Sequence, residues 1–266
     1  MLDLEFAQLS DPGRVRDHNE DYLGHVAPAT PDEAHRHGWL FALADGVGGQ
    51  DRGEVASRVA IEAVLEGFRK ASRGESLTAL IPRLVQAANT RVFEAGMATG
   101  HAGSNMATTL VACALRFDRA IISHAGDSRC YLIRQGYAAA LTRDHTVANE
   151  QLRMGLVTGG EAAKSEIAHV LSRSLGANMF LSVDTSENQL SPEDVLLLCS
   201  DGLHNSLAPE DIARLAGHGD SLTTAAAEMV ALAKERDGGD NISVQLIRVR
   251  GVERVGMYRG RHYKLH

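Results

Sequence analysis

The stretch FALADGVGG, residues 41–49, ends an apolar run on an aspartate and continues with three glycines in four positions. An apolar run bounded by turn residues predicts a strand that is buried on both faces. Asp45 would then lie at the rim of the core, where an unpaired charge is costly. We therefore expect a compensating partner for Asp45, and the glycines would let the backbone approach that partner closely.

Acidic residues recur at other predicted strand ends, beside glycine or serine in most cases. They are Glu20, Asp21, Asp127, Asp201 and Asp240. One such residue usually makes an Asx turn or a helix cap. Four to five together are harder to explain as turns, because the strand ends of a packed sheet converge on one rim. Carboxylates gathered there repel one another and raise one another's pKa unless a cation neutralises them.

The type of ligand selects the cation. A set of oxygen ligands without cysteine or histidine suits Mg²⁺ or Mn²⁺, with Ca²⁺ as an alternative, and does not suit zinc. A D-x-D-x-D-G calcium loop, a P-loop and a complete dinucleotide-binding glycine pattern are all missing from the sequence. Carboxylates at separate chain positions instead indicate a pair of ions that share ligands, which is a common way to hydrolyse phosphate esters.

Composition excludes several other classes of function. The chain has 266 residues, 44% of them hydrophobic, and a net charge of −7, which argues against a nucleic-acid or membrane-surface partner. Cys113, Cys130 and Cys199 lack the spacing of a zinc site or a disulfide framework, so we expect buried reduced thiols. The first residues do not resemble a secretion signal, and the apolar runs are too short to cross a bilayer. We expect a cytoplasmic protein.

Strands and helices are predicted in clusters rather than in regular alternation. Strands are expected at 3–9, 22–27, 38–44, 107–116, 119–125, 129–134, 180–184, 194–199 and 242–249. Two amphipathic helices, beginning near Arg52 and near Ile81, separate the third strand from the fourth, and Pro82 should lie in the first turn of the second helix or kink it. Further helices are expected at 209–217 and 222–234. This order argues against a doubly wound parallel sheet.

Five motifs occur in a fixed order: G-x-x-R-x-x-N-E-D at 13–21, D-G-x-G-G at 45–49, G-D-S-R at 126–129, S-D-G-L at 200–203 and G-G-D-N at 238–241. With them the chain resembles the metal-dependent serine/threonine protein phosphatases of the protein phosphatase 2C (PPM) family, especially the compact bacterial members, over roughly residues 5–249. The resemblance implies an α+β fold: a four-layer α-β-β-α sandwich of two antiparallel β-sheets flanked by helices.

The resemblance also divides the chain. It implies a phosphatase domain at 1–249, followed by a basic C-terminal extension at 250–266. Residues 146–170, which carry three glycines, resemble the mobile flap of the family, and we expect this segment to contact the protein substrate. We call residues 146–170 the flap.

The resemblance implies a site for two Mn²⁺ or Mg²⁺ ions. Asp45 resembles the ligand that bridges both ions, and the carbonyl oxygen of Gly46 is a further ligand. Asp201 and Asp240 resemble the carboxylates that complete the shell of one ion.

The remaining positions are assigned in the same way. Glu20 and Asp21 resemble the residues that act on the other ion, partly through water. Asp127 resembles the ligand that, together with Asp201, holds a third and weaker ion. Arg16 resembles the residue that grips the substrate phosphate, and the planar guanidinium matches phosphate oxygens better than a lysine would.

The implied reaction is hydrolysis of phosphoserine and phosphothreonine monoesters on proteins by a metal-activated water, without a covalent phosphoenzyme. The implied partners are phosphorylated proteins, including a bacterial serine/threonine kinase or its substrates. Two alternatives remain. One is a catalytically silent relative that binds phosphoproteins without hydrolysing them; such a protein should have lost metal carboxylates. The other is a phosphatase of the sporulation and stress-response branch, which usually has altered motifs and attached sensor domains.

Val47 departs from the eukaryotic family pattern, which has a histidine at this position as a candidate general acid. Valine cannot donate a proton, so the sequence leaves the acid for the leaving group unassigned. Four histidines lie in or near the motifs, and we interpret each as structural or surface-exposed: His18, His124, His145 and His204.

Overall fold

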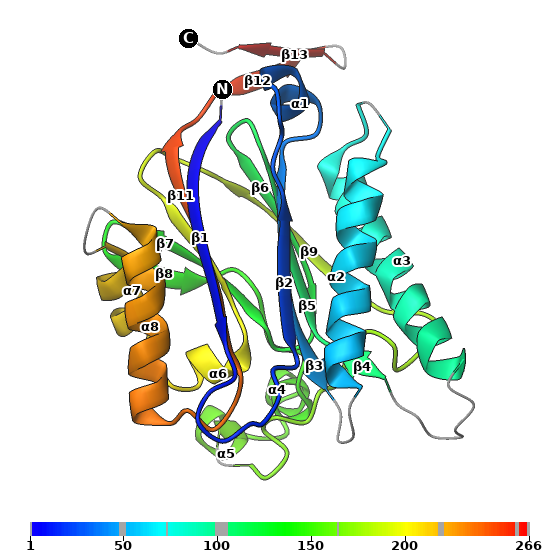
Figure 1. Ribbon diagram of the computed structural model, residues 1–266, viewed down its shortest axis with the longest axis vertical. Coiled ribbons are helices and arrows are strands. Elements are labelled where there is room, and N and C mark those ends of the chain that lie inside the picture. Colours follow the sequence, from blue (N-terminus) through cyan, green and yellow to red (C-terminus); the bar gives the residue numbers. More distant parts are fainter. Residues whose placement is uncertain are drawn as a thin grey trace.

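The computed structural model describes residues 2–47, 52–72, 74–98, 106–163, 165–217, 221–258 and 261–264. Within these residues the protein forms four layers, with two β-sheets in the middle and a pair of helices on each outer face (Figure 1). The expected α+β sandwich of two antiparallel sheets is confirmed. Gly48 and Gly49 of the D-G-x-G-G motif lie outside the described residues.

The first sheet has the strand order β1-β11-β10-β7-β8, and every neighbouring pair is antiparallel. Its strands are β1 (Asp3–Asp11), β11 (Ile242–Gly251), β10 (Val195–Cys199), β7 (Arg129–Arg134) and β8 (Tyr137–Ala140). The first and last strands of the sandwich are therefore neighbours, with Asp11 opposite Ile242.

The second sheet has the order β2-β3-β5-β6-β9, also antiparallel throughout, with β4 paired to β3. Its strands are β2 (Asp21–Val26), β3 (Trp39–Val47), β4 (Ala107–Thr108), β5 (Leu110–Arg116), β6 (Arg119–Ala125) and β9 (Asp184–Gln189). Beyond the sandwich, β12 (Val255–Tyr258) and β13 (Arg261–Lys264) form a separate hairpin.

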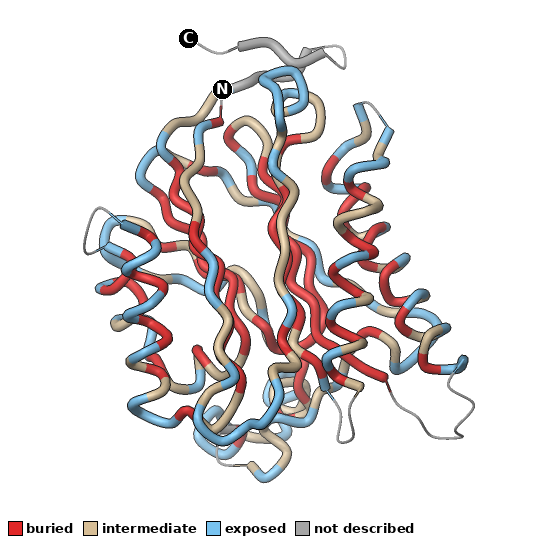
Figure 2. Tube along the Cα trace, viewed as in Figure 1, coloured by how far each residue is buried: buried red, intermediate tan, exposed pale blue. Residues whose placement is uncertain are grey.

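Two long helices cover each outer face. The second sheet is covered by α2 (Gly53–Arg69) and α3 (Leu77–Ala98), and the first sheet by α7 (Pro209–Gly217) and α8 (Leu222–Arg236). Short helices complete the chain: α1 (Pro31–Arg36), α4 (Val147–Arg153), α5 (Gly159–Ala163) and α6 (Asp201–His204). Each long helix buries one face and exposes the other, as its apolar spacing predicts (Figure 2).

Burial explains the apolar run that opens the D-G-x-G-G motif. Along β3, Leu40, Ala42 and Ala44 pack into the core formed with α2 and α3. The alternate residues Phe41 and Leu43 pack into the core between the two sheets. Because side chains alternate between the faces of a strand, a strand with helices on one side and a sheet on the other is apolar at every position. The predicted burial on both faces is confirmed.

Two local predictions differ from the structure. The strand expected at 180–184 is wrong, because the structure has a strand at β9 instead. Leu181 and Val183 pack against the core between the second sheet and its two helices, and the Leu181 N–H donates to the Gln86 side chain at 3.1 Å. β9 is polar because it is an edge strand paired only with β6. The second long helix begins at Leu77 instead of near Ile81, so Pro82 lies inside it, and of the two alternatives for Pro82 the kink stays a prediction.

None of the helices in the described part of the chain is both long enough and apolar enough to cross a membrane.

Candidate metal centre

The predicted acids lie at one end of the sandwich, where strands of both sheets terminate. In the second sheet Asp21 begins β2 directly opposite Asp45 near the end of β3. In the first sheet Asp201 follows β10, and Asp240 precedes β11. Asp127 lies in the turn that joins β6 of one sheet to β7 of the other. The antiparallel register therefore brings together residues more than 200 positions apart in the sequence.

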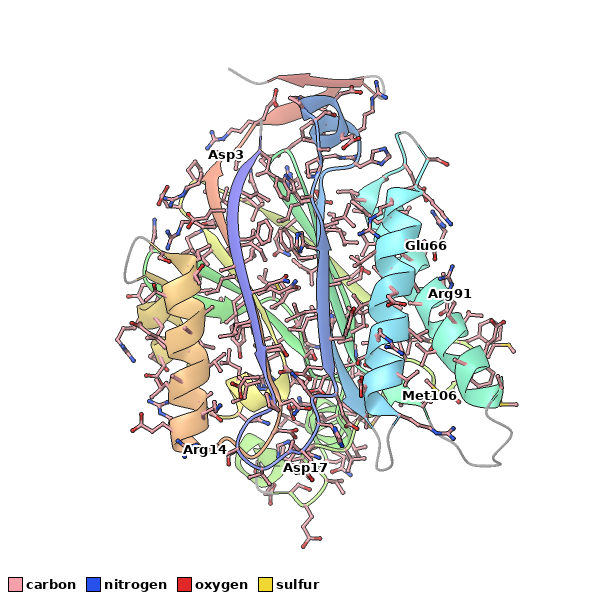
Figure 3. All side chains as sticks on the ribbon, viewed as in Figure 1. Asp3, Arg14, Asp17, Glu66, Arg91 and Met106 are labelled. Atoms are coloured by element: carbon pink, nitrogen blue, oxygen red, sulfur yellow. The ribbon has the colours of Figure 1, made fainter. Side chains whose placement is uncertain are left out.

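A pocket of about 340 Å³ opens at this end. The described residues that line it are Arg16, Glu20, Asp45, Gly46, Val47, Thr109, Asp127, His169, Leu171, Asp201 and Asp240. All predicted site residues except one are in this lining. The exception is Asp21, which is 6% exposed and lies behind the pocket wall, where its Oδ2 accepts a hydrogen bond from Ser200 Oγ at 2.8 Å. Figure 3 shows the loop between β1 and β2, with labelled Arg14 and Asp17, at this end of the sandwich.

Burial and mutual repulsion raise the pKa values of four of these carboxyl groups. Burial raises the pKa of Asp21 to about 7, hydrogen bonds from Ser243 and Ser200 oppose the rise, and Asp201 and Asp240 add to it by repulsion. The pKa of Asp45 is raised well above its ordinary value by burial and then by the charge of Asp21. Without a bound cation, ionised carboxylates at this end of the molecule would therefore destabilise the fold.

The same causes act on the two remaining buried acids. Burial raises the pKa of Asp127 to about 7, and repulsion by Asp201 and Asp144 adds to the rise. Burial also raises the pKa of Asp201, with repulsion from Asp240 as the next cause. Carboxylates in this condition hold protons near neutral pH unless a cation replaces them.

Two buried carboxylate oxygens indicate what the site fits. Among the residues that the structure describes, Asp21 Oδ1 and Asp201 Oδ1 are buried and have no hydrogen-bond partner. A buried carboxylate oxygen without a partner is costly. The predicted donors are carboxylates and one backbone carbonyl, which is the donor set that Mg²⁺ and Mn²⁺ prefer. The residues therefore fit divalent cations, and they fit zinc poorly.

Two threonines that the sequence analysis did not single out hold Asp45 in place. The Asp45 N–H donates to Thr109 Oγ1 at 2.9 Å, and the Asp45 carbonyl accepts from the Thr109 N–H and Thr108 Oγ1, both at 2.8 Å. Thr109 Oγ1 also lies 2.7 Å from Ser128 Oγ. The Asp45 backbone is therefore fixed by β4 and β5 before any ligand binds.

Glycines let the start of α2 approach the site. A Cβ on Gly46 would lie 2.3 Å from the Gly53 backbone, so a larger residue at position 46 cannot fit without moving the helix. A Cβ on Gly53 would in turn lie 2.7 Å from the Glu20 carboxyl carbon. Glu20 thus lies beside the first turn of α2, where the helix dipole favours a negative charge. The sequence analysis missed Gly53, because a single glycine before a helical pattern carries no signal.

The loop that carries Arg16 and Glu20 is held by Asn241, the last residue of the G-G-D-N motif. Asn241 Nδ2 donates to the carbonyls of Pro12 and His18 at 3.0 and 2.9 Å, and its Oδ1 accepts from the Glu20 N–H at 2.8 Å. Arg16 Nη2 donates to Asp240 Oδ2 at 2.8 Å.

Three of the four motif-adjacent histidines are structural. The rings of His124 and His145 stack with centroids 4.6 Å apart, and burial lowers the pKa of each. His145 Nε2 lies 3.2 Å from Asp184 Oδ2, and Arg173 already contributes a positive charge there, 2.8 Å from the other Asp184 oxygen. His204 is half-buried, and desolvation of its ring lowers its pKa to about 4.

His18, the fourth, is exposed on the β1–β2 loop and does not line the pocket. All four are therefore structural or surface residues, as the sequence analysis interpreted them.

The flap reaches the pocket through its last residues. It contains α4, α5 and a turn, and the Val147 N–H donates to the Val170 carbonyl at 2.8 Å, which joins its two ends. His169 and Leu171 then line the pocket beside the carboxylates. The sequence analysis missed His169, because this part of the chain has neither a clear period nor a motif. The mobility of the flap stays a prediction.

Comparisons with known proteins agree with this geometry. A family model described as protein phosphatase 2C matches residues 17–237. The serine/threonine phosphatase stp of Listeria welshimeri is 31% identical over 258 residues, which cover 95% of this chain and 96% of that protein.

Solved structures are similar as well. The S. agalactiae serine/threonine phosphatase has a TM-score of 0.82 at 30% identity, covering 92% of this chain and 99% of that chain. The catalytic domain of the serine/threonine protein phosphatase PstP, in complex with two manganese ions, has a TM-score of 0.78 at 32% identity, covering 94% and 100%.

Proposed function

The chain belongs to the protein phosphatase 2C family, and from this membership we propose that it hydrolyses phosphoserine and phosphothreonine monoesters on proteins with divalent cations. The observation that carries the proposal is the set of carboxylates from both sheets around one pocket, with raised pKa values and two buried oxygens lacking partners. The relatives named above are serine/threonine phosphatases, and one was solved with two manganese ions.

We assign the cations to the pocket wall. Asp45 and the Gly46 carbonyl would hold two ions between them, with Asp201 and Asp240 completing one shell. Glu20 and Asp21 would serve the other ion, and Asp127 a third, weaker one. When bound, the cations supply an activated water and offset negative charge on the phosphoryl group. The chain's own part is to fix the carboxylates, which the threonines at 108 and 109 do through the Asp45 backbone.

Arg16 is the proposed phosphate-binding residue. Its guanidinium is half-exposed at the pocket and bonded to Asp240, so it already lies where an anion would meet the cations. A phosphate oxygen offers the guanidinium the same charge-assisted hydrogen bond as the Asp240 carboxylate does. The expected substrates are phosphoproteins made by a bacterial serine/threonine kinase.

A chelation experiment tests the proposal. The protein is freed of metal with a chelator, and Mn²⁺ or Mg²⁺ is then added back in the presence of p-nitrophenyl phosphate or a phosphothreonine peptide. We expect turnover of both substrates with metal and none without it. Full activity in the chelated protein would refute the metal assignment. Binding of the peptide without turnover at any metal concentration would favour the silent relative, which the intact set of acids argues against.

A further inference from the structure

The proposed reaction requires a proton that no residue considered so far supplies. When the bond between phosphorus and a serine or threonine oxygen breaks, that oxygen keeps the electron pair, and a free alkoxide is a poor leaving group. A positioned acid that protonates such an oxygen contributes typically about 10²–10⁴-fold to the rate. Val47 lines the pocket but has no proton to donate.

The other charged side chains of the pocket already have proposed roles. They face the pocket from the β1–β2 loop, from β3, from the β6–β7 turn, from α6 and from the segment that precedes β11: Arg16, Glu20, Asp45, Asp127, Asp201 and Asp240. The carboxylates are the proposed cation ligands, and a guanidinium does not give up its proton near neutral pH. Among the described residues of the lining, the remaining side chain that can carry and donate a proton is the imidazole of His169.

The flap fixes where His169 stands. Its neighbour Val170 accepts a hydrogen bond from the Val147 N–H at 2.8 Å and donates one to the Ile167 carbonyl at 3.1 Å. The backbone beside His169 is therefore held, and His169 is exposed and lines the pocket. Burial raises the pKa of Asp201, and a positive charge on His169 opposes this rise, so the imidazole lies within electrostatic reach of that carboxylate.

We propose that His169 is the general acid of this enzyme, which protonates the departing serine or threonine oxygen in place of the residue missing at position 47. The inference rests on the proposed function. The attacking water releases one proton to solvent, its oxygen forms a bond to phosphorus, and the bond between phosphorus and the serine or threonine oxygen breaks. That oxygen takes the electron pair and a proton from an imidazolium nitrogen of His169. The neutral imidazole then regains a proton from solvent.

The proposal is tested by comparing two leaving groups. A p-nitrophenolate needs little protonation, whereas a threonine alkoxide needs it strongly. We expect His169→Ala and His169→Gln to reduce kcat for a phosphothreonine peptide about 10²-fold or more, and to change kcat for p-nitrophenyl phosphate less than about threefold. His37→Ala, at the far end of the molecule beside α1, is the matched histidine control and should change neither substrate.

Two further measurements separate proton donation from a structural role. The wild type should lose kcat for the peptide as pH rises, and this alkaline limb should be missing from the profile of His169→Gln. In the His169→Ala background, Val47→His should restore at least part of the peptide rate. Independently of turnover, the His169 ring resonance should shift when inorganic phosphate is titrated into the Mg²⁺-loaded protein, because phosphate would occupy the same pocket.

The outcomes are distinguishable. Equal losses on both substrates, an unchanged alkaline limb, or a ring resonance that phosphate does not move would overturn the assignment of His169. If the wild type turns over neither substrate with metal, the proposed function itself fails.

Discussion

The carboxylate rim (Glu20, Asp45, Asp127, Asp201 and Asp240, with Asp21 behind it) and the flap meet at one pocket and are built in contrasting ways. The rim residues lie at strand ends, several of them on the mostly buried strands β3, β6, β10 and β11, and Asp45 is tied to two threonines through its backbone. The flap consists of two short helices and a turn, with Met154 and Leu156 65% and 69% exposed. The rim is therefore held by the core, whereas the flap is held by a few hydrogen bonds at its base.

This contrast indicates a division of labour. Under the proposed function, the groups that would hold a cation lie on strand ends anchored in the core, and the groups that would contact a protein substrate lie on a more exposed segment. The predictions below test whether the two regions can be damaged separately.

The largest expected effect comes from the rim. Asp45→Asn or Asp201→Asn should reduce turnover of both substrates at least about 10³-fold, because each removes a cation ligand and its charge. Circular dichroism should show a folded protein. Asp17→Asn, an exposed aspartate on the neighbouring loop, is the control and should retain activity. Substantial activity in Asp45→Asn would show that the rim carboxylates do not hold the catalytic cations.

Arg16 should show a smaller effect that is shared by both substrates. A charge-assisted hydrogen bond contributes about 1.5–3 kcal/mol, so Arg16→Ala should lower kcat/KM roughly 10- to 100-fold. The loss should be the same for the aryl phosphate and the peptide, because the phosphoryl group is common to both. Arg14→Ala, two residues away on the same loop, serves as the control. Unchanged kinetics would make Arg16 an ordinary surface arginine.

The flap should show the opposite pattern. Met154→Ser and Leu156→Ser should lower kcat/KM for a protein substrate about three- to tenfold and leave p-nitrophenyl phosphate unaffected, because exposed apolar side chains there would contact only a large substrate. Met97→Ser on α3, with a side chain 70% exposed, is the matched control. If both substrates lose equally, the flap supports the rim instead of selecting the substrate.

The smallest expected effect concerns the stability of the metal-free rim. Asp127 has a pKa of about 7 in the folded protein against about 4 when unfolded, so between these values the folded state binds the extra proton. The contribution of Asp127 to stability is therefore present at low pH and is lost as pH rises toward 7. Histidines with lowered pKa values, such as His204, act in the opposite direction, so the informative quantity is a difference between variants.

In chelator, Asp127→Asn should gain stability relative to the wild type as pH rises from 5 to 8. A gain of about 1 kcal/mol would appear as roughly 2–4 °C in Tm. Added Mn²⁺ should abolish or reverse the gain, because the cation stabilises only the carboxylate. A difference in Tm that does not change with pH would mean that the pKa of Asp127 is not raised in the metal-free protein.

The sequence predicts the rim much better than the flap, for physical reasons. A strand buried on both faces is apolar at each position, so the polar residue that ends it stands out, as Asp45 does after Phe41–Ala44. The acids of the other strand ends are visible in the same way. Thr108 and Thr109 carry no such signal, because a threonine in or beside a strand is ordinary. Their role depends on the pairing of β3 with β4, which the sequence pattern does not predict.

The flap and the polar edge strand show where prediction from sequence fails. β9 lacks an apolar alternation because it pairs on one side only, so the apolar residues just before it suggested a strand in the wrong place. His169 could not be identified because its position depends on hydrogen bonds that close the flap, such as Val147 to Val170, and not on a repeating pattern.

The pairing of β1 with β11 has a consequence for how the protein becomes active as it is synthesised. Asp11 lies opposite Ile242, so one of the widest loop closures in the domain must occur before this edge of the sheet exists. Asn241, which clamps the loop bearing Arg16 and Glu20, immediately precedes that strand. A nascent chain that has not yet released β11 from the ribosome therefore has neither Asp240 nor an anchored Arg16 in place. We therefore expect catalytic competence to arrive together with the closing strand, and a nascent chain that lacks this strand should be inactive.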